Sequence, residues 1–277
     1  MNFIKKIGII VFLAAIGLLV FGCNEEESDP INVNMSVPGL SELESSGKTS
    51  VASPKEAEEL FEEVSEEIVG VIMGVIEDIM TSVNTNMYGG AASPNMLSFL
   101  TPSSARAVNV ELNGDESSIS YLVTFADEPC GEGTVNGFVS ANMSGNETSM
   151  NVSGKAKVSI DLDSEVIKGK LTVSLNGSVK QNSDGMSVNM SISTNNAFTV
   201  IGQSKGMKVL MSASFNFKET ISMESEPTEE EIGNWVENAN ISLSIYKDNG
   251  ALVQKFSKED ILQLIENAVS AAGEPAP

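Results

Sequence analysis

The sequence predicts a mostly β protein with flanking helices (α+β). We expect a curled, largely antiparallel meander sheet of about ten strands, with an apolar face covered by a long N-terminal helix and a C-terminal helix. Two observations lead to this prediction. From Val108 to Phe217, apolar and polar residues alternate with the period of two that is typical of half-buried strands. In residues 54–83, apolar residues instead recur at helical spacing.

The chain begins with a short charged segment and a long apolar one. Lys5 and Lys6 precede residues 7–22, which carry no charge. This uncharged run is shorter than the ~20 apolar residues that a membrane-spanning helix needs. The pattern is typical of an export signal, and the alternative is an uncleaved anchor helix.

The residues at the end of this run, VFGC, resemble the lipobox of bacterial lipoproteins, although Phe21 stands where a small residue is usual. The resemblance implies removal of residues 1–22 as a lipoprotein signal peptide and attachment of lipid, including palmitate, to Cys23. Asn24 stands where an aspartate would retain a lipoprotein in the inner membrane. We therefore expect anchoring in the cell envelope, at the outer membrane (periplasmic or surface face) if the cell has two membranes.

Composition divides the mature chain into two parts. Residues 23–53 are polar, rich in serine and glutamate, and interrupted by Pro30 and Pro38, which predicts a lipidated, disordered tether. Residues 54–277 form a single predicted domain, the helix-covered β-sheet. Its first helix begins after Ser53, with a proline at the first helical position.

Turn signals divide the alternating region into strands, because glycine, asparagine, aspartate and serine clusters separate the apolar runs. A last hairpin turns on Asn249 and Gly250, and Ser257 caps a C-terminal helix with Asp260 at its third position. An acidic segment around Trp235 predicts another short helix. The turn signals lie near residues 113, 127, 144, 163, 182, 193, 202 and 247.

Composition also excludes several kinds of site. The formal charge is −22, and loss of the signal peptide with its two lysines would make it −24, which disfavours nucleic acid and anionic head groups as partners. The chain has no histidine, so Ser/His and Cys/His nucleophiles and imidazole metal ligands are excluded. Asp161, Asp163 and Glu165 share a strand end but lack the glycine turn of a calcium loop. We expect no enzyme activity, no catalytic residues, no cofactor and no metal site.

Methionines mark a candidate ligand site on the apolar face. Pairing the strands as a simple meander brings Met143, Met150, Met186 and Met207 to one end of the sheet, where flexible thioethers suit an adaptable apolar groove. The alternative is that methionine only fills gaps between the sheet and its covering helix. The candidate groove rim comprises Met143, Met150, Met186, Met190, Met207 and Met211.

The order of elements and the anchor are similar to the open-barrel carriers of the lipoprotein-localisation group, which hold lipid in a curled sheet covered by helices. No motif of that group is matched. We expect a non-enzymatic, membrane-anchored lipoprotein that binds a lipid or another hydrophobic ligand in the concave face of its sheet. The alternative is a structural or surface-interaction lipoprotein with a fully packed core and a protein or glycan partner. The sequence identifies no protein partner.

Overall fold

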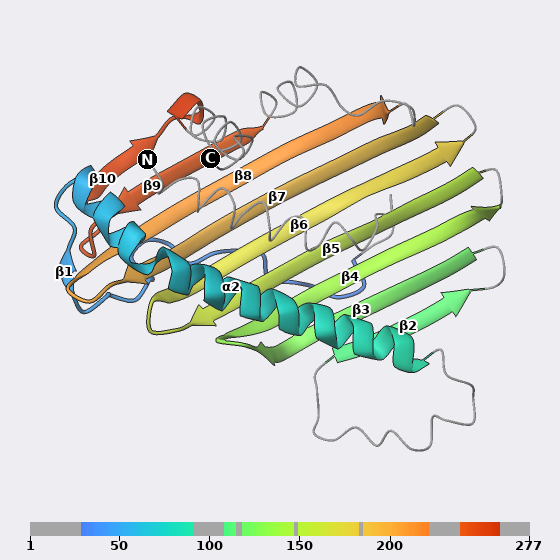
Figure 1. Cartoon of the computed structure of the whole chain (residues 1–277), viewed down its shortest axis with the longest axis horizontal. Helices are drawn as coiled ribbons and strands as arrows, with labels where there is room; N and C mark the ends of the chain where they lie inside the picture. The colour runs from blue at the N-terminus through green and yellow to red at the C-terminus, as the bar shows by residue number, and fades with distance from the viewer. Residues whose placement is uncertain are drawn as a thin grey trace, which may run out of the picture.

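A computed structural model describes residues 29–90, 108–114, 118–146, 149–182, 185–221 and 239–260. Nine strands follow one another in an open antiparallel sheet with the order β10-β9-β8-β7-β6-β5-β4-β3-β2, and β1 pairs in parallel with β8 (Figure 1). This arrangement confirms the predicted fold class. The strands are β1 (Thr49–Ser50), β2 (Val108–Gly114), β3 (Ser118–Cys130), β4 (Gly133–Asn146), β5 (Ser149–Asp163), β6 (Ile167–Asn182), β7 (Gly185–Ile201), β8 (Lys205–Ile221), β9 (Asn240–Tyr246) and β10 (Leu252–Phe256).

The N-terminal helix α2 (Pro54–Gly90) is longer than the sequence predicts. A capping box starts it: the Glu56 amide donates to Ser53 Oγ at 3.3 Å, and the Ala52 amide donates to the Glu56 carboxylate at 2.7 Å. The helix crosses one face of the sheet diagonally, while the strands continue well beyond it (Figure 1). We call this face the inner face and the opposite one the outer face.

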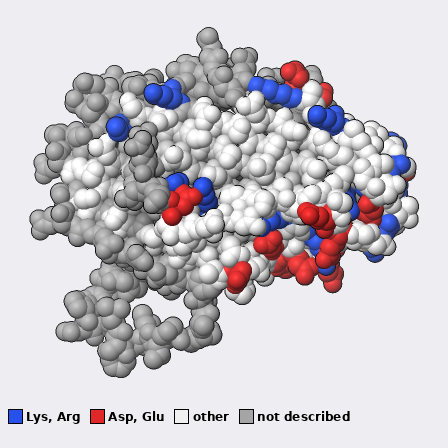
Figure 2. Space-filling view, turned by 180° about the vertical axis from the view of Figure 1, so that it is seen from behind, with Lys and Arg blue, Asp and Glu red and all other residues white. Residues whose placement is uncertain are grey.

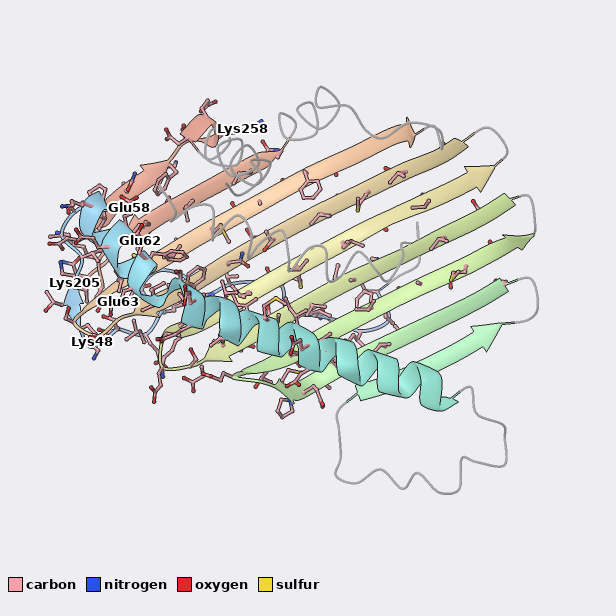
Figure 3. All side chains as sticks on the ribbon, viewed as in Figure 1. Lys48, Glu58, Glu62, Glu63, Lys205 and Lys258 are labelled. Atoms are coloured by element: carbon pink, nitrogen blue, oxygen red, sulfur yellow. The ribbon has the colours of Figure 1, made fainter. Side chains whose placement is uncertain are left out.

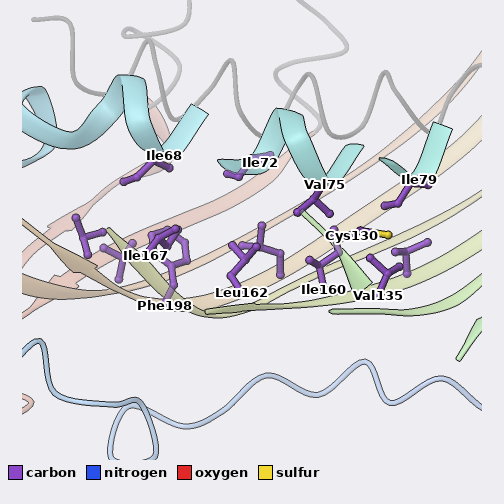
Figure 4. Packing of buried hydrophobic residues seen from close by; sticks show 14 of the residues in the cluster. Ile68, Ile72, Val75, Ile79, Cys130, Val135, Ile160, Leu162, Ile167 and Phe198 are labelled. Carbon is purple, nitrogen blue, oxygen red and sulfur yellow. The ribbon is translucent and has the colours of Figure 1, made fainter. Parts of the chain in front are cut away.

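The helix lies over the ends of the strands at which β3 turns into β4 and β7 into β8, which we call the near end. Here the Gly131 amide donates to Asp78 Oδ2, and the Gln203 amide donates to Glu63 Oε1, both at 2.7 Å. The opposite end, where β4 turns into β5 and β6 into β7, is the far end. The apolar stripe of α2 packs against the inner face of the near end (Figure 4) and consists of Leu60, Phe61, Val64, Ile68, Ile72, Val75 and Ile79.

The strand register differs by two residues from the simple meander pairing used for the methionine prediction, which places Val139 beside Gly154. Val139 pairs with Ala156, which pairs with Leu175. The faces are nevertheless as predicted, because a shift of two residues leaves each side chain on its own face. Two inward glycines at the near end, Gly137 and Gly169, have φ of 148° and 141°, and a Cβ at either would collide with a carbonyl oxygen of the neighbouring strand. The strands bend there because glycine is present.

The predicted turn near residue 193 is wrong, because β7 continues through it. Thr194 and Asn196 point to the inner face, where both are buried. Asn196 Oδ1 accepts hydrogen bonds from Thr194 Oγ1 at 3.0 Å and from the Thr172 amide at 3.1 Å. The polar run resembles a turn locally, but β6 and β8 pair with it on both sides and keep it extended. On the β6 side, Thr172 Oγ1 accepts from the Asn195 amide at 3.2 Å and donates to the Asn195 carbonyl at 2.7 Å, which satisfies these backbone groups.

The tether prediction differs from the structure over residues 29–53. Residues 29–48, which we call the strap, lie on the outer face of the sheet, behind it in Figure 1. The Thr199 hydroxyl donates to the Glu44 carbonyl at 2.8 Å, and buried Lys208 donates to the Leu43 carbonyl at 2.8 Å. Composition alone predicts disorder because it contains no information about partners that are distant in the sequence. Residues 24–28 of the predicted tether lie outside the described residues.

The chain's last predicted helix is described only at its start. Ser257 and Asp260 form the expected capping box, with the Asp260 amide donating to Ser257 Oγ at 3.1 Å and the Ser257 amide donating to Asp260 Oδ2 at 2.8 Å. The rest of that helix and the predicted helix around Trp235 lie outside the described residues, as do residues 1–22 and Cys23.

Candidate functional site: the inner face beyond the helix

An apolar surface continues on the inner face from the helix toward the far end. It follows from alternation, since each strand there places every second residue inward. One row across four strands contains Ala141, Gly154, Gly177 and Met190. The next row toward the far end contains Met143, Val152, Val179 and Val188.

The second row is less buried than the core beneath α2, whereas Ala141, Gly154 and Gly177 of the first row are buried. Val152, Val179 and Val188 are half-buried, and Met190 and Phe215 pack against the core while remaining partly accessible. Met143 is 42 % exposed. Figure 3 shows side chains continuing along the strands past the helix. The described part of the inner face therefore changes from a sealed core at the near end to a partly open apolar surface at the far end.

The structure brings together some of the six predicted rim methionines. Met150 and Met186 both pair with Gln181 at the far end, and Met143 lies on the adjacent strand two residues before Gly145, the partner of Met150. The backbone thus confirms this part of the juxtaposition. The side chains of Met150 and Met186 lie outside those that the structure describes.

Met207 does not belong to this group. It pairs with Val200 at the near end and is fully buried in the core. The prediction was wrong because it placed a turn near residue 193. Without that turn β7 spans the whole sheet, so the start of β8 lies at the opposite end from the start of β7.

Met190 and Met211 lie between these extremes. Met190 pairs with Gly177, where the absent side chain leaves it room, and Met211 pairs with Asn196 and Leu243. Both are partly buried and pack against the core. Met190 borders the open surface, whereas Met211 lies closer to the helix-covered part.

Sequence reasoning missed one polar feature of the inner face, the Thr194–Asn196 pair described above. The sequence does indicate that both residues point inward, because they continue the alternation of inward residues from Ile192 to Phe198. Because Asn196 Oδ1 already accepts two hydrogen bonds, the pair stabilises the strand register at the edge of the apolar surface.

The outer face carries an ionic contact that orders the strap. The Asp29 carboxylate lies 2.5 Å from Lys155 Nζ and also contacts Lys157 Nζ. Burial would raise the pKa of Asp29, but hydrogen bonds from Lys155 and then Lys157, with their charges, outweigh burial and hold it below its usual range. The carboxylate therefore stays ionised at neutral pH.

Searches of the described residues show no group of three or more acidic or cysteine side chains placed to hold a metal ion. Cys130, the last residue of β3, is buried against α2. No helix among the described ranges has the length and hydropathy to cross a membrane. The chain matches no protein-family model, no curated protein and no solved structure.

Proposed function

We propose that this chain is a non-enzymatic lipoprotein of the bacterial envelope that binds a lipid or another hydrophobic ligand on the far half of its inner face. The observation that carries the proposal is the partly open apolar surface, which spans adjacent strands and includes Met143 at 42 % exposure. Burying such side chains is favourable by about 1.5–3 kcal/mol each when burial is complete.

The shape of the surface favours a flexible apolar ligand such as an acyl chain. The row of Ala141, Gly154 and Gly177 is a buried strip of small residues, bordered by exposed Met143 on one side and by half-buried Met190 at its end. Small residues let a ligand approach the backbone closely, and methionine adapts its shape to what binds. On β8 the second row continues with Glu219, the partner of Val188, whose side chain lies outside those that the structure describes.

The anchor is supported by the sequence alone. The VFGC motif places lipid on Cys23, and two or three acyl chains would make release from a membrane slow. Replacing Cys23 with serine should abolish palmitate labelling of the protein. Label that persists in this variant, or that is absent from the parent, would refute the lipobox.

Ligand binding is tested by native mass spectrometry of residues 24–277, expressed in bacteria and purified gently. We expect a population with an added mass equal to that of a bound lipid. Met143→Glu should deplete it, because a carboxylate on the apolar surface opposes acyl contact. Ser144→Glu is the matched control, since Ser144 is exposed on the outer face of the same strand.

Bare protein in every sample would refute the carrier proposal and favour the structural alternative, in which the core is filled and a partner binds elsewhere. Equal depletion by Met143→Glu and Ser144→Glu would place the ligand away from the inner face.

A further inference from the structure

The strap fixes where the anchored segment leaves the domain. Asp29, its first residue, is held by Lys155 and Lys157 on the outer face of β5. This strand is interior to the sheet, with three strands on one side and five on the other. Only five residues, 24–28, lie between Cys23 and Asp29, and we call this connection the leash.

From this attachment we infer that the outer face is the membrane-facing surface of the protein, and that the inner face with its apolar surface points away from the membrane that holds the anchor. The inference rests on lipidation of Cys23, which belongs to the proposed function. The partner is the lipid surface itself.

The length of the leash carries the first argument. The six Cα–Cα steps from Cys23 to Asp29 span at most about 20–22 Å when the chain is fully extended. To place the inner face against the membrane, the leash would first have to reach the nearer sheet edge, three strands away at about 4.8 Å each, or about 14 Å. It would then have to pass the sheet and the helix on it, which adds about 10 Å for the helix and a similar distance for the layer spacing. The required path of about 35 Å exceeds the leash.

Charge distribution gives a second, independent argument. The described part of α2, on the inner side, carries one lysine, Lys55, and many acidic residues, three of which are labelled in Figure 3. The acidic residues are Glu56, Glu58, Glu59, Glu62, Glu63, Glu66, Glu67, Glu77 and Asp78. Such a helix is repelled by the anionic head groups of a membrane.

The lysines of the sheet lie on the other side. Strand alternation places them on the outer face, where Figure 2 shows basic groups together with acidic groups that gather at the lower right of the view. Strap and strand acids partly offset them: Asp163 lies 2.7 Å from Lys168, and Glu44 lies 3.7 Å from the same lysine. The outer face thus lacks the acidic excess of the inner side. The outward lysines are Lys155, Lys157, Lys168, Lys170, Lys180, Lys208 and Lys218.

This separation changes what the net charge of −22 means for a membrane. The whole-chain value predicts repulsion from anionic lipid. Because the acidic helix α2 lies on the inner side, repulsion from anionic lipid instead favours the orientation in which the outer face points toward the membrane. A hydrophobic ligand on the inner face would then be exchanged with the opposite compartment or with a partner arriving from it.

Orientation is tested with the lipidated full-length protein in vesicles of phosphatidylethanolamine and phosphatidylglycerol that contain an energy-transfer acceptor lipid. Single donor dyes are attached at Ser193→Cys, exposed on the outer face of β7, or at Glu66→Cys, exposed on α2. Cys130 is buried and Cys23 carries lipid, so neither competes for dye. The outer label lies nearer the membrane by about one sheet and one helix layer, about 20 Å, and should transfer energy at least about twofold more efficiently.

A matched control lengthens the leash. Twenty Gly/Ser residues inserted between residues 28 and 29 add up to about 70 Å of extended reach and should reduce the difference between the two transfer efficiencies to the part that charge maintains. Equal transfer from both labels, or stronger transfer from Glu66→Cys, in protein that carries palmitate would overturn the orientation while leaving the anchor intact. A difference that the insertion leaves entirely unchanged would overturn the leash argument. Absence of palmitate from the parent would overturn the anchor and the orientation with it.

Discussion

Removing one leucine side chain should release the strap without unfolding the sheet. Leu43 is the buried apolar residue of the strap, with 6 % exposure, and its carbonyl accepts a hydrogen bond from Lys208. The perturbation is Leu43→Ala. The other apolar residues of the strap are only half-buried, so the substitution should act on local opening of the strap more than on global unfolding; they are Ile31, Val33, Met35, Val37 and Leu40.

The magnitude follows from burial. Leu→Ala substitutions at buried sites cost about 2–5 kcal/mol, and the low end is appropriate here because the strap lies at a surface and can relax. A cost of about 2 kcal/mol corresponds to about a 30-fold increase in the population of the opened strap. Two amides report it: Ser46, which donates to Asp248 Oδ2 at 3.1 Å, and Thr49, which donates to the Ser204 carbonyl at 3.2 Å.

Hydrogen exchange read by mass spectrometry measures this effect. Peptides covering Ser46 and Thr49 should exchange about 30-fold faster in Leu43→Ala, while peptides from the centres of β5 and β6 stay unchanged. Leu252→Ala is the matched control, because this leucine of β10 is 55 % exposed and its loss should leave the strap alone. Unchanged strap exchange in Leu43→Ala, or an equal change in Leu252→Ala, would refute the reasoning.

Three further predictions concern stability. Gly137→Ala should lower the free energy of unfolding by more than about 1 kcal/mol, because Gly137 has a positive φ. Gly74→Ala should raise the free energy of unfolding by about 0.5–1 kcal/mol, because the space around its Cβ is open. Urea unfolding measures both variants, and equal effects would contradict the proposed need for glycine at residue 137. The pKa of Asp29 is lower in the folded chain than in the unfolded one, so its contribution is complete above the unfolded pKa of about 3.9 and is lost as pH falls through the folded value. Strap exchange, corrected for intrinsic rates, should therefore accelerate below about pH 4 in the parent, and Asp29→Asn should remove that step. Asn196→Leu should cost about 1–3 kcal/mol by leaving the Thr172 amide without its acceptor, and an unchanged urea midpoint would show that the contact is not needed.

Much of the fold follows from local sequence patterns. The period-two alternation identifies the inner face correctly, and the capping residues Ser53 and Ser257 mark both helix starts. The exact register does not follow, because pairing Ala156 with Val139 or with a residue two positions away buries the same face. Register depends on turn geometry and on the bends at Gly137 and Gly169, which become visible only when the strands are assembled.

The candidate site could be predicted only in part, for the same reason. Met143, Met150 and Met186 flank short turns, so a meander brings them together whatever the exact register. The position of Met207 depends on the whole length of β7. Interpreting the polar run near residue 193 as a turn therefore placed Met207 at the wrong end of the sheet. The strap was missed because its order comes from partners more than a hundred residues away, such as Lys157 for Asp29.

Photo-crosslinking tests the central claim most directly, namely that a hydrophobic ligand lies on the far half of the inner face. The chain of residues 24–277 is incubated with a photoreactive fatty acid, irradiated, digested and analysed by mass spectrometry. Crosslinks should concentrate on inward residues of β4–β7 such as Met143, Val188 and Met190, and unlabelled fatty acid should compete for them. Crosslinks confined to the strap or the outer face, or labelling that no competitor reduces, would contradict it.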